Sequence, residues 1–286
     1  MKYILKKLTK TTVWKDIFID RLTEPIHLNV LSLFILLFGP YRRKIDFDLI
    51  VRRHHAYGIM KCADYAKRSQ IKTVSQVEFG VDSGAGILNI ADIAEKVTKE
   101  TGIKFNIYGF DTGEGLPEAL DYRDHPDLYQ YGDFPMNSEM LSKYLPENVK
   151  LIIGNVKDTV EKFINNININ EPIGFVSFDL DYYHSTKNAL RVFKAENPLK
   201  YMPITIIYID DIDEEENNNY CGPLLGVNEF NCENDFRKIE HSRFLENARI
   251  FKRAQWIKKI YFLHVLDHPT RFKIKLREKK LYLEKP

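Results

Sequence analysis

From residue 73 onward, short apolar runs alternate with segments whose apolar residues recur every three or four positions. The runs predict buried strands and the longer segments predict helices. Strands are expected at residues 73–79, 105–110, 151–153, 173–178 and 204–209, and helices at residues 85–101, 158–165 and 185–194. Strands that are apolar on both faces and alternate with helices are typical of a parallel sheet covered on two sides.

The C-terminal part of the pattern predicts two more strands, at residues 259–265 and 271–282, which would close the sheet as an antiparallel pair. Residues 1–70 have a helical, basic pattern and are interpreted as an N-terminal cap. The predicted fold is therefore α/β: a Rossmann-like, doubly wound, mostly parallel seven-stranded sheet with an antiparallel C-terminal strand and an N-terminal helical cap. Residues 71–286 would form the main domain.

Residues 112–149 separate the second and third expected strands and are rich in Tyr, Asp and Pro. So long a connection inside a compact domain is usually a lid or a substrate-binding insertion. Tyr122, Tyr129 and Tyr131 are candidates to cover a cyclic ligand, and simple packing within the lid is the alternative.

The most apolar window covers residues 26–38. It is shorter than the roughly 20 residues that a membrane-spanning helix needs, and no small-residue cleavage site of a signal peptide follows it. We expect a helix that is buried or faces a partner, with contact to a membrane surface as the alternative. An apolar patch of this size usually needs covering, which favours a homodimer.

Charge is distributed unevenly along the 286 residues, although the net charge is only +2. Residues 1–70 carry 14 basic and 6 acidic side chains, residues 71–248 carry 16 and 31, and residues 249–286 carry 12 and 3. An acidic centre argues against a nucleic-acid-binding core. The three cysteines are sparse and form no C-x-x-C pair, which disfavours a disulfide framework and favours a reducing compartment, most simply the cytoplasm.

Glycine or polar residues follow all five expected parallel strands, at the sheet edge where ligands bind in open parallel sheets. They are Glu78, Gly80, Ser83, Gly84 and Gly86 at the first strand, Asp111 at the second, Gly154, Asn155 and Val156 at the third, Asp179, Asp181 and His184 at the fourth, and Asp210 and Asp211 at the fifth. The glycine loop lets a ligand approach the backbone, although a tight strand-to-helix turn would need the same residues. A carboxylate at Asp111 suits the two hydroxyls of a ribose. Together these two features indicate a nucleoside ligand.

The four aspartates after the fourth and fifth strands would repel one another unless a cation or protons compensate them. An all-oxygen set suits a hard divalent ion such as Mg²⁺, whereas helix capping or a surface loop would explain one or two of the aspartates. His184 lies about one helical turn after Asp181 and could act as a general base; a structural histidine is the alternative.

Five runs then resemble a known family: VEFGVDSGAG (77–86), GFDTGEGLP (109–117), DFP (133–135), SFDLDYYHSTKNAL (177–190) and YIDDI (208–212). They resemble class I S-adenosylmethionine-dependent methyltransferases, most of all the macrolide-sugar O-methyltransferase type and related bacterial methyltransferases of unassigned acceptor. The resemblance covers roughly residues 50–270, and the segments around Asp111 and Asp181 are its most specific parts.

The resemblance implies a role for each matching position. Glu78, Gly80, Ser83 and Gly84 would line the methionine end of the cofactor, Asp111 would hold its ribose, Asn155 and Val156 would border its adenine, Asp179 would lie beneath its amine, and Asp181, Asp210 and Asp211 would bind Mg²⁺. Either His184 or Asp181 would receive the acceptor's proton. The implied reaction is Mg²⁺-dependent O-methylation of a sugar or another small cyclic acceptor.

Three other functions use some of the same residues. A metal-dependent glycosyltransferase would use Asp179-Leu180-Asp181 as a D-x-D motif, but not the glycine loop joined to Asp111. The spacing Gly80-x-x-x-Gly84-x-Gly86 disfavours a nicotinamide oxidoreductase. A non-catalytic α/β binding protein would have no need for polar residues at five strand ends.

Overall fold

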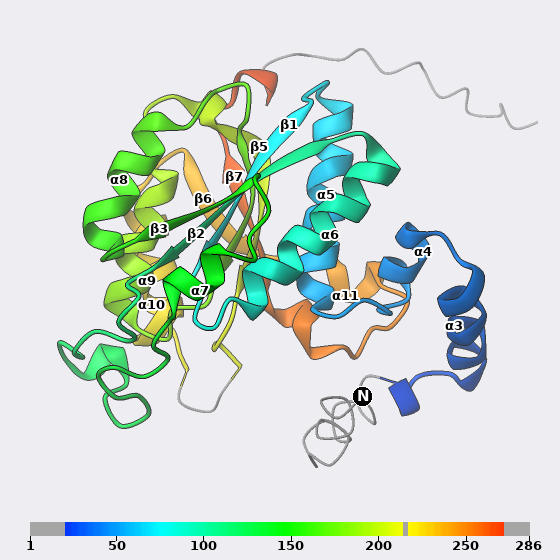
Figure 1. The fold of residues 1–286 in the computed structure, drawn as a ribbon, viewed down its shortest axis with the longest axis horizontal. Helices are drawn as coiled ribbons and strands as arrows, with labels where there is room; N and C mark the ends of the chain where they lie inside the picture. The colour runs from blue at the N-terminus through cyan, green and yellow to red at the C-terminus, as the bar shows by residue number, and fades with distance from the viewer. Residues whose placement is uncertain (1–20, 214–216, 272–286) are drawn as a thin grey trace, which may run out of the picture.

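The computed structural model describes residues 21–213 and 217–271. Its centre is a seven-stranded sheet of order β3-β2-β1-β4-β5-β7-β6 (Figure 1). The strands are β1 (Thr73–Phe79), β2 (Lys104–Asp111), β3 (Val149–Ile153), β4 (Ile173–Phe178), β5 (Tyr201–Ile209), β6 (Arg237–His241) and β7 (Ile260–Val265). Neighbouring strands are parallel, except that β7 is antiparallel to β5 and β6. The predicted Rossmann-like, mostly parallel sheet is confirmed.

Helices cover both faces of the sheet (Figure 1). They are α3 (Ile26–Phe38), α4 (Tyr41–Asp46), α5 (Arg53–Arg68), α6 (Ala85–Thr101), α7 (Ser138–Ser142), α8 (Val156–Asn166), α9 (Tyr183–Ala189), α10 (Gly222–Glu233) and α11 (Leu245–Ala248). One buried cluster joins α5 and α6 to the sheet, and a second joins α8, α9 and α10 to its other face. Gly58 lets α5 lie close to the sheet, because a Cβ there would come within 2.3 Å of the Phe175 ring.

Most expected elements coincide with observed ones. β1, β4 and α6 have the predicted bounds, and α6 ends before Gly102, whose φ of 79° is the left-handed conformation of a helix C-cap. The predicted closing pair is corrected. β7 pairs antiparallel with β5 and with β6, and β6 was not expected as a strand. Residues 272–282 of the predicted last strand lie outside the described residues, and Arg271 ends a short 3₁₀ helix.

The N-terminal helices have opposite environments. Half of α5 is buried against the sheet, including His55, Ala56 and Cys62. In α3 only Ser32 and Ile35 are buried. Of the two expectations for residues 26–38, the helix is therefore not buried among the described residues, and a helix that faces a partner stays a prediction. Of the helices in the described ranges, none combines the length and the apolar character needed to cross a membrane.

Candidate active site

A cavity of about 380 Å³ opens at the carboxyl edge of the parallel strands. Its wall contains residues from the ends of five neighbouring strands: Phe79 and Gly80 after β1, Asp111 at the end of β2, Gly154 after β3, Asp179 after β4 and Asp211 after β5. Each of the five strand ends that the sequence singled out therefore contributes to one space, because parallel strands bring their carboxyl ends to the same edge. Of the residues named there, Glu78, Ser83, Gly84, Gly86, His184 and Asp210 do not line it.

Glycine is required at two points of the loop between β1 and α6. Gly80 has a φ of 82°, and a Cβ there would lie 1.8 Å from the Asp179 carbonyl oxygen. Gly84 has a φ of 85° and packs against the side chain of Leu141 on α7. Gly80 allows the end of β1 to lie close to the backbone that follows β4. Gly84 allows the insertion to pack on the loop through Leu141.

Glu78 lies beneath the glycine loop and outside the cavity wall. Its side chain is buried, and Oε2 has no hydrogen-bond partner among the described residues. Burial, together with the negative charges of Asp179 and Asp111, raises the pKa of Glu78 to about 8, while Arg52 acts in the opposite direction. A buried carboxyl oxygen without a partner at this edge is suited to accept a hydrogen bond from a cationic ligand. Ser83 is exposed and does not line the cavity.

Asp111 fastens the loop and also lines the cavity. Its Oδ2 accepts hydrogen bonds from the backbone amides of Val81 (2.9 Å) and Asp82 (3.0 Å), and its Oδ1 accepts one from the Gly113 amide (2.8 Å). A carboxylate has about four acceptor sites, so Asp111 retains capacity for a ligand hydroxyl.

The third strand end supplies one side of the cavity. Asn155 is the N-cap of α8, and its side chain accepts a hydrogen bond from the Lys157 amide at 2.9 Å. Asn155 and Val156 both line the cavity, as do the apolar side chains of Phe110 and Leu180. This part of the wall is flat and mostly apolar, which suits an aromatic base.

The aspartates after β4 and β5 lie close together. One carboxylate oxygen from each of Asp179, Asp210 and Asp211 lies within 4.8 Å of the others. Burial, followed by the charges of Asp210 and Asp211, raises the pKa of Asp179 to about 7. Asp181 is not in this group of three, although it shares a side-chain hydrogen bond with Asp211, and burial and Asp211 raise its pKa to about 8. Crowded carboxylates of this kind fit a hard divalent cation.

Lys259 is a site residue that the sequence analysis missed. Its Nζ lies 2.6 Å from Asp210 Oδ1 and 2.7 Å from Asp213 Oδ1. Burial alone would raise the pKa of Asp210, but the charge and hydrogen bond of Lys259 outweigh it, so the pKa is lowered. Lys259 directly precedes β7, and no motif marks it; only the pairing of β7 with β5 brings it to this edge. Of the four aspartates after β4 and β5, Lys259 forms its ion pair with Asp210.

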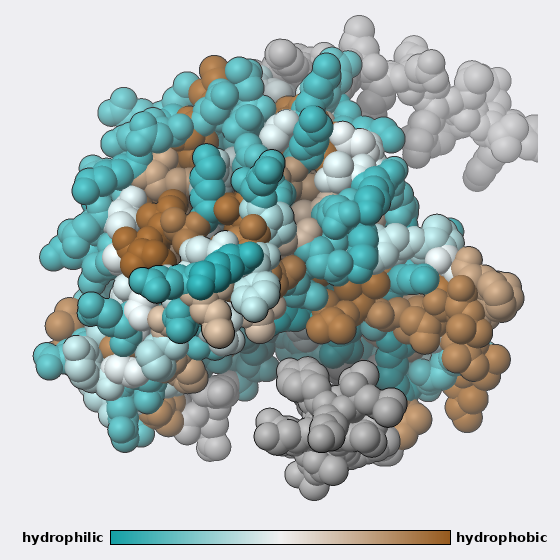
Figure 2. Space-filling model, in the orientation of Figure 1, coloured by the Kyte–Doolittle hydropathy of each residue, from teal (hydrophilic) through white to brown (hydrophobic). Residues whose placement is uncertain are grey.

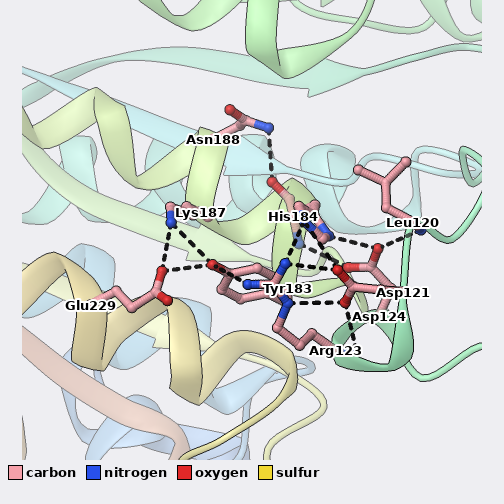
Figure 3. A network of polar contacts seen from close by, with 9 residues as sticks. All are labelled: Leu120, Asp121, Arg123, Asp124, Tyr183, His184, Lys187, Asn188 and Glu229. Carbon is pink, nitrogen blue, oxygen red and sulfur yellow. Dashed lines mark hydrogen bonds and ion pairs between the residues drawn. The ribbon is translucent and has the colours of Figure 1, made fainter.

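His184 is held by a buried carboxylate that the sequence did not indicate (Figure 3). Its Nδ1 lies 2.8 Å from Asp124 Oδ2, and its backbone amide donates to Asp124 Oδ1 at 2.9 Å. Asp124 also accepts from the Leu120 amide at 2.9 Å and has no exposed surface. Because Asp124 accepts from Nδ1–H, it fixes the ring orientation and leaves Nε2 as the basic nitrogen.

The surroundings of His184 are cationic as well as acidic. Arg123 forms an ion pair with Asp121 at 2.7 Å, lies over the Tyr183 ring at 4.5 Å and has one nitrogen 3.4 Å from His184 Nε2. His184 itself does not line the cavity, whereas its neighbours Asp181 and Ser185 do. The structure therefore puts the two candidate bases at different distances from the cavity: Asp181 on its wall and His184 behind it.

The insertion at residues 112–149 forms one wall of the cavity. Leu116, Pro117, Tyr129, Asp133 and Phe134 line it, and Tyr129 shares a side-chain hydrogen bond with Asp181. Tyr122 and Tyr131, the other two tyrosines singled out in this segment, are exposed and do not line it.

No protein-family model and no curated protein matches the chain. Among solved structures, it is similar to the calicheamicin methyltransferase CalS11, with 19% identity and a TM-score of 0.46 over 71% of this chain and 83% of that one. It is also similar to MycE from the mycinamycin pathway, in complex with Mg and SAH, with 12% identity and a TM-score of 0.35 over 70% of this chain and 47% of that one. A third similar structure is an O-methyltransferase from Bacillus cereus in complex with SAH, with 14% identity and a TM-score of 0.34 over 71% of this chain and 79% of that one.

The chain thus spans about half the length of the MycE chain. All three of these proteins are named as methyltransferases, with identities below 25% and TM-scores below 0.5. Similarity at this level does not establish an activity, so the function follows from the residues of the site.

Proposed function

We propose that the protein is an S-adenosylmethionine-dependent O-methyltransferase that acts with Mg²⁺ on a hydroxyl of a sugar or another small cyclic acceptor. The observation that carries this proposal is the single cavity that joins the glycine loop and Asp111 to Asp179, Asp181 and Asp211. A nucleoside-type site and a crowded carboxylate site are thereby adjacent, as a reaction between a nucleoside cofactor and a metal-held hydroxyl requires.

Each end of the cofactor has a matching part of the cavity. Asp111 would accept hydrogen bonds from the ribose hydroxyls, and Asn155 and Val156 would border the adenine beside Phe110. Asp179 on the cavity wall would attract the methionine amine, and Gly80 would let the backbone approach it closely. Glu78, Ser83 and Gly84 lie outside the cavity wall and are assigned to this end by the resemblance alone. S-Adenosylmethionine supplies a methyl group on a sulfonium, which is electrophilic without further activation, so the chain's main task is to position the acceptor oxygen in line with it.

Asp181, Asp210 and Asp211 would hold Mg²⁺, with Asp179 at its margin. The close oxygens support Asp210 and Asp211, and they place Asp179 as the third member of the group. Asp181 is supported by its hydrogen bond with Asp211, which together with burial raises the pKa of Asp181. Mg²⁺ would lower the pKa of a coordinated acceptor hydroxyl. Lys259 already occupies one oxygen of Asp210, so that residue would offer its other oxygen.

Asp181 and His184 are the two candidate bases. Asp181 lies on the cavity wall and would reach the acceptor proton directly. His184, oriented by Asp124, would receive the proton from Asp181 or through a water molecule. In the second arrangement Asp124 is a positioning residue, because it acts on the acceptor only through the imidazole.

A metal-dependent glycosyltransferase is the second candidate function. Asp179 and Asp181 flank Leu180, and all three line the cavity, so a D-x-D motif faces the same space. The two functions differ in the nucleotide they need: S-adenosylmethionine for the first and a nucleoside diphosphate sugar for the second.

Thermal unfolding with S-adenosylhomocysteine or UDP, each with Mg²⁺ or EDTA, separates the two. We expect stabilisation by S-adenosylhomocysteine in both conditions, and its loss in Asp111→Ala but not in the surface control Asp92→Ala, which pairs with Lys96. Stabilisation by UDP and not by S-adenosylhomocysteine would replace this proposal with the glycosyltransferase. Mass spectrometry of an extract supplied with methyl-labelled cofactor would then identify the acceptor.

A further inference from the structure

The exposed apolar surface of α3 has no part in the cavity. Figure 1 shows α3 standing away from the sheet, at the opposite end from α8, and Figure 2 shows hydrophobic side chains covering that end. Eight large apolar side chains of this helix are between 44% and 80% exposed: Ile26, Val30, Leu31, Leu33, Phe34, Leu36, Leu37 and Phe38. No other described helix exposes as many.

The exposed positions surround most of the helix. At 100° per residue, they spread over about 220° of its circumference, and only the side occupied by Leu28, Ser32 and Ile35 faces the protein. A helix that packs against one partner helix buries a stripe of about 100°. A second copy of this chain docked on α3 would therefore leave more than half of the apolar arc in water. A hydrocarbon environment would cover all of it.

The helix has the dimensions of an interfacial segment. Its 13 residues extend about 20 Å, less than the roughly 30 Å of a bilayer core. Residues 25–41 contain no Lys, Arg, Asp or Glu. His27 is exposed and is the one titratable residue within α3. The rings of Phe34 and Phe38 are tilted by 47° with centroids 5.2 Å apart, and they form an aromatic end to the helix.

Basic residues border this apolar surface. Arg43 on α4 is exposed, and so are Lys252 and Arg253, whose backbone amides bind Glu24 Oε1 just before α3 at 2.8 Å and 3.0 Å. Over residues 1–44 the sequence contains nine basic and three acidic side chains, a net charge of +6. Positive charge beside an apolar helix complements the headgroups of anionic lipids.

We propose that α3 docks the protein onto the surface of a membrane containing anionic lipid, with its apolar arc in the acyl region and the basic residues at the headgroups. The helix would lie in the interface without crossing the bilayer. This inference rests on α3 and its flanks, and it stands or falls independently of methyl transfer.

Vesicle co-sedimentation of the full chain tests the proposal. We expect binding to vesicles of phosphatidylcholine with phosphatidylglycerol, binding weaker by at least tenfold to phosphatidylcholine alone, and weakening as salt rises from about 0.1 M to about 0.5 M. The variant Leu33→Ser/Phe34→Ser/Leu37→Ser should lose at least tenfold in vesicle affinity. The matched control Ile169→Ser/Leu199→Ser/Phe236→Ser changes exposed apolar residues elsewhere and should bind as the wild type does.

Two results would overturn the proposal. One is the absence of binding to anionic vesicles while sedimentation velocity shows a dimer that the α3 variant dissociates, since α3 would then be a protein interface. The other is the absence of vesicle binding by a monomeric wild type. Far-UV circular dichroism of both triple variants shows whether each is folded, and a variant that fails is replaced by the single change Phe34→Ser with the same comparison against Phe236→Ser.

Discussion

Asp48 and the aspartates at the cavity differ in how their charge is balanced. Asp48 is paired with the buried guanidinium of Arg249 at 2.7 Å, and Trp256 Nε1 lies 3.4 Å away. Around the cavity, Asp179 and Asp181 face Asp211 with no described Lys or Arg within ion-pair distance of either.

Backbone strain does not distinguish Asp48 from the aspartates at the cavity. Asp48, Asp181 and Asp211 all have positive φ values, of 52°, 50° and 49°. A left-handed backbone is therefore common to both groups and does not distinguish a site from a structural centre. Direct ion pairing does: Asp48 has a guanidinium at 2.7 Å, although burial still raises its pKa. The pKa values of Asp179 and Asp181 are raised by burial and by neighbouring carboxylates, which an added cation would offset.

Arg249→Met would test the structural centre and should have the largest effect. It leaves Asp48 buried without its partner and removes the donor to the carbonyl oxygens of Ile45 and Asp46. We expect the free energy of unfolding to fall by about 3–5 kcal/mol in urea denaturation. Arg191→Met, which breaks an exposed pair with Glu161, should cost less than about 1 kcal/mol. Equal losses in the two variants would remove the distinction between the groups.

Asp181→Ala would test the uncompensated group. Turnover with Mg²⁺ should fall at least about 100-fold, while affinity for S-adenosylhomocysteine, measured by calorimetry, changes by less than about threefold. Without Mg²⁺ the free energy of unfolding should rise, because one of several like charges is gone. The control Asp82→Ala also changes an acidic residue of the cavity wall, but one outside the cluster. A parallel loss of cofactor affinity in Asp181→Ala would show that the metal is misplaced.

Asp124→Asn would test whether the buried carboxylate of Asp124 affects catalysis by orienting His184. The amide cannot stabilise an imidazolium as a carboxylate does, so kcat should fall about tenfold with KM little changed, and the pH dependence of kcat should shift. Asp92→Asn, which alters an exposed ion pair with Lys96 on α6, should leave that pH dependence in place. An unchanged pH profile in Asp124→Asn would assign the base role to Asp181 alone.

Glu78→Gln should change the pH dependence of stability. Burial raises the pKa of Glu78 from 4.5 to about 8, so between these values the folded state holds a proton that the unfolded state has released. The free energy of unfolding therefore falls as pH rises, by up to about 1.4 kcal/mol per pH unit for this group. Urea denaturation across this range should give a shallower decline in Glu78→Gln, and no change in the exposed control Glu95→Gln. Identical slopes in wild type and Glu78→Gln would mean that the carboxyl is ionised throughout.

Local pattern predicted the parts of the fold whose signals lie within one element. β1 and β4 are apolar on both faces, and α6 has a periodic face between glycines, so their bounds were predicted correctly. β6 has the sequence RKIEH, in which Ile239 is the one apolar residue, and a short polar edge strand has no detectable periodicity. The helix α10 was not predicted either, because its sequence GPLLGVNEFNCE contains two glycines and a proline.

The sequence by itself determined that glycines and carboxylates follow five strands, because each lies beside an apolar run whose period is local. Only the tertiary structure decided how charge is shared among them. Lys259 reaches Asp210 from 49 positions away and Asp124 reaches His184 across 60, and no local pattern encodes such a pairing. The same holds for α3: its apolar composition is plain in the sequence, but its exposure depends on which residues the rest of the chain packs against it.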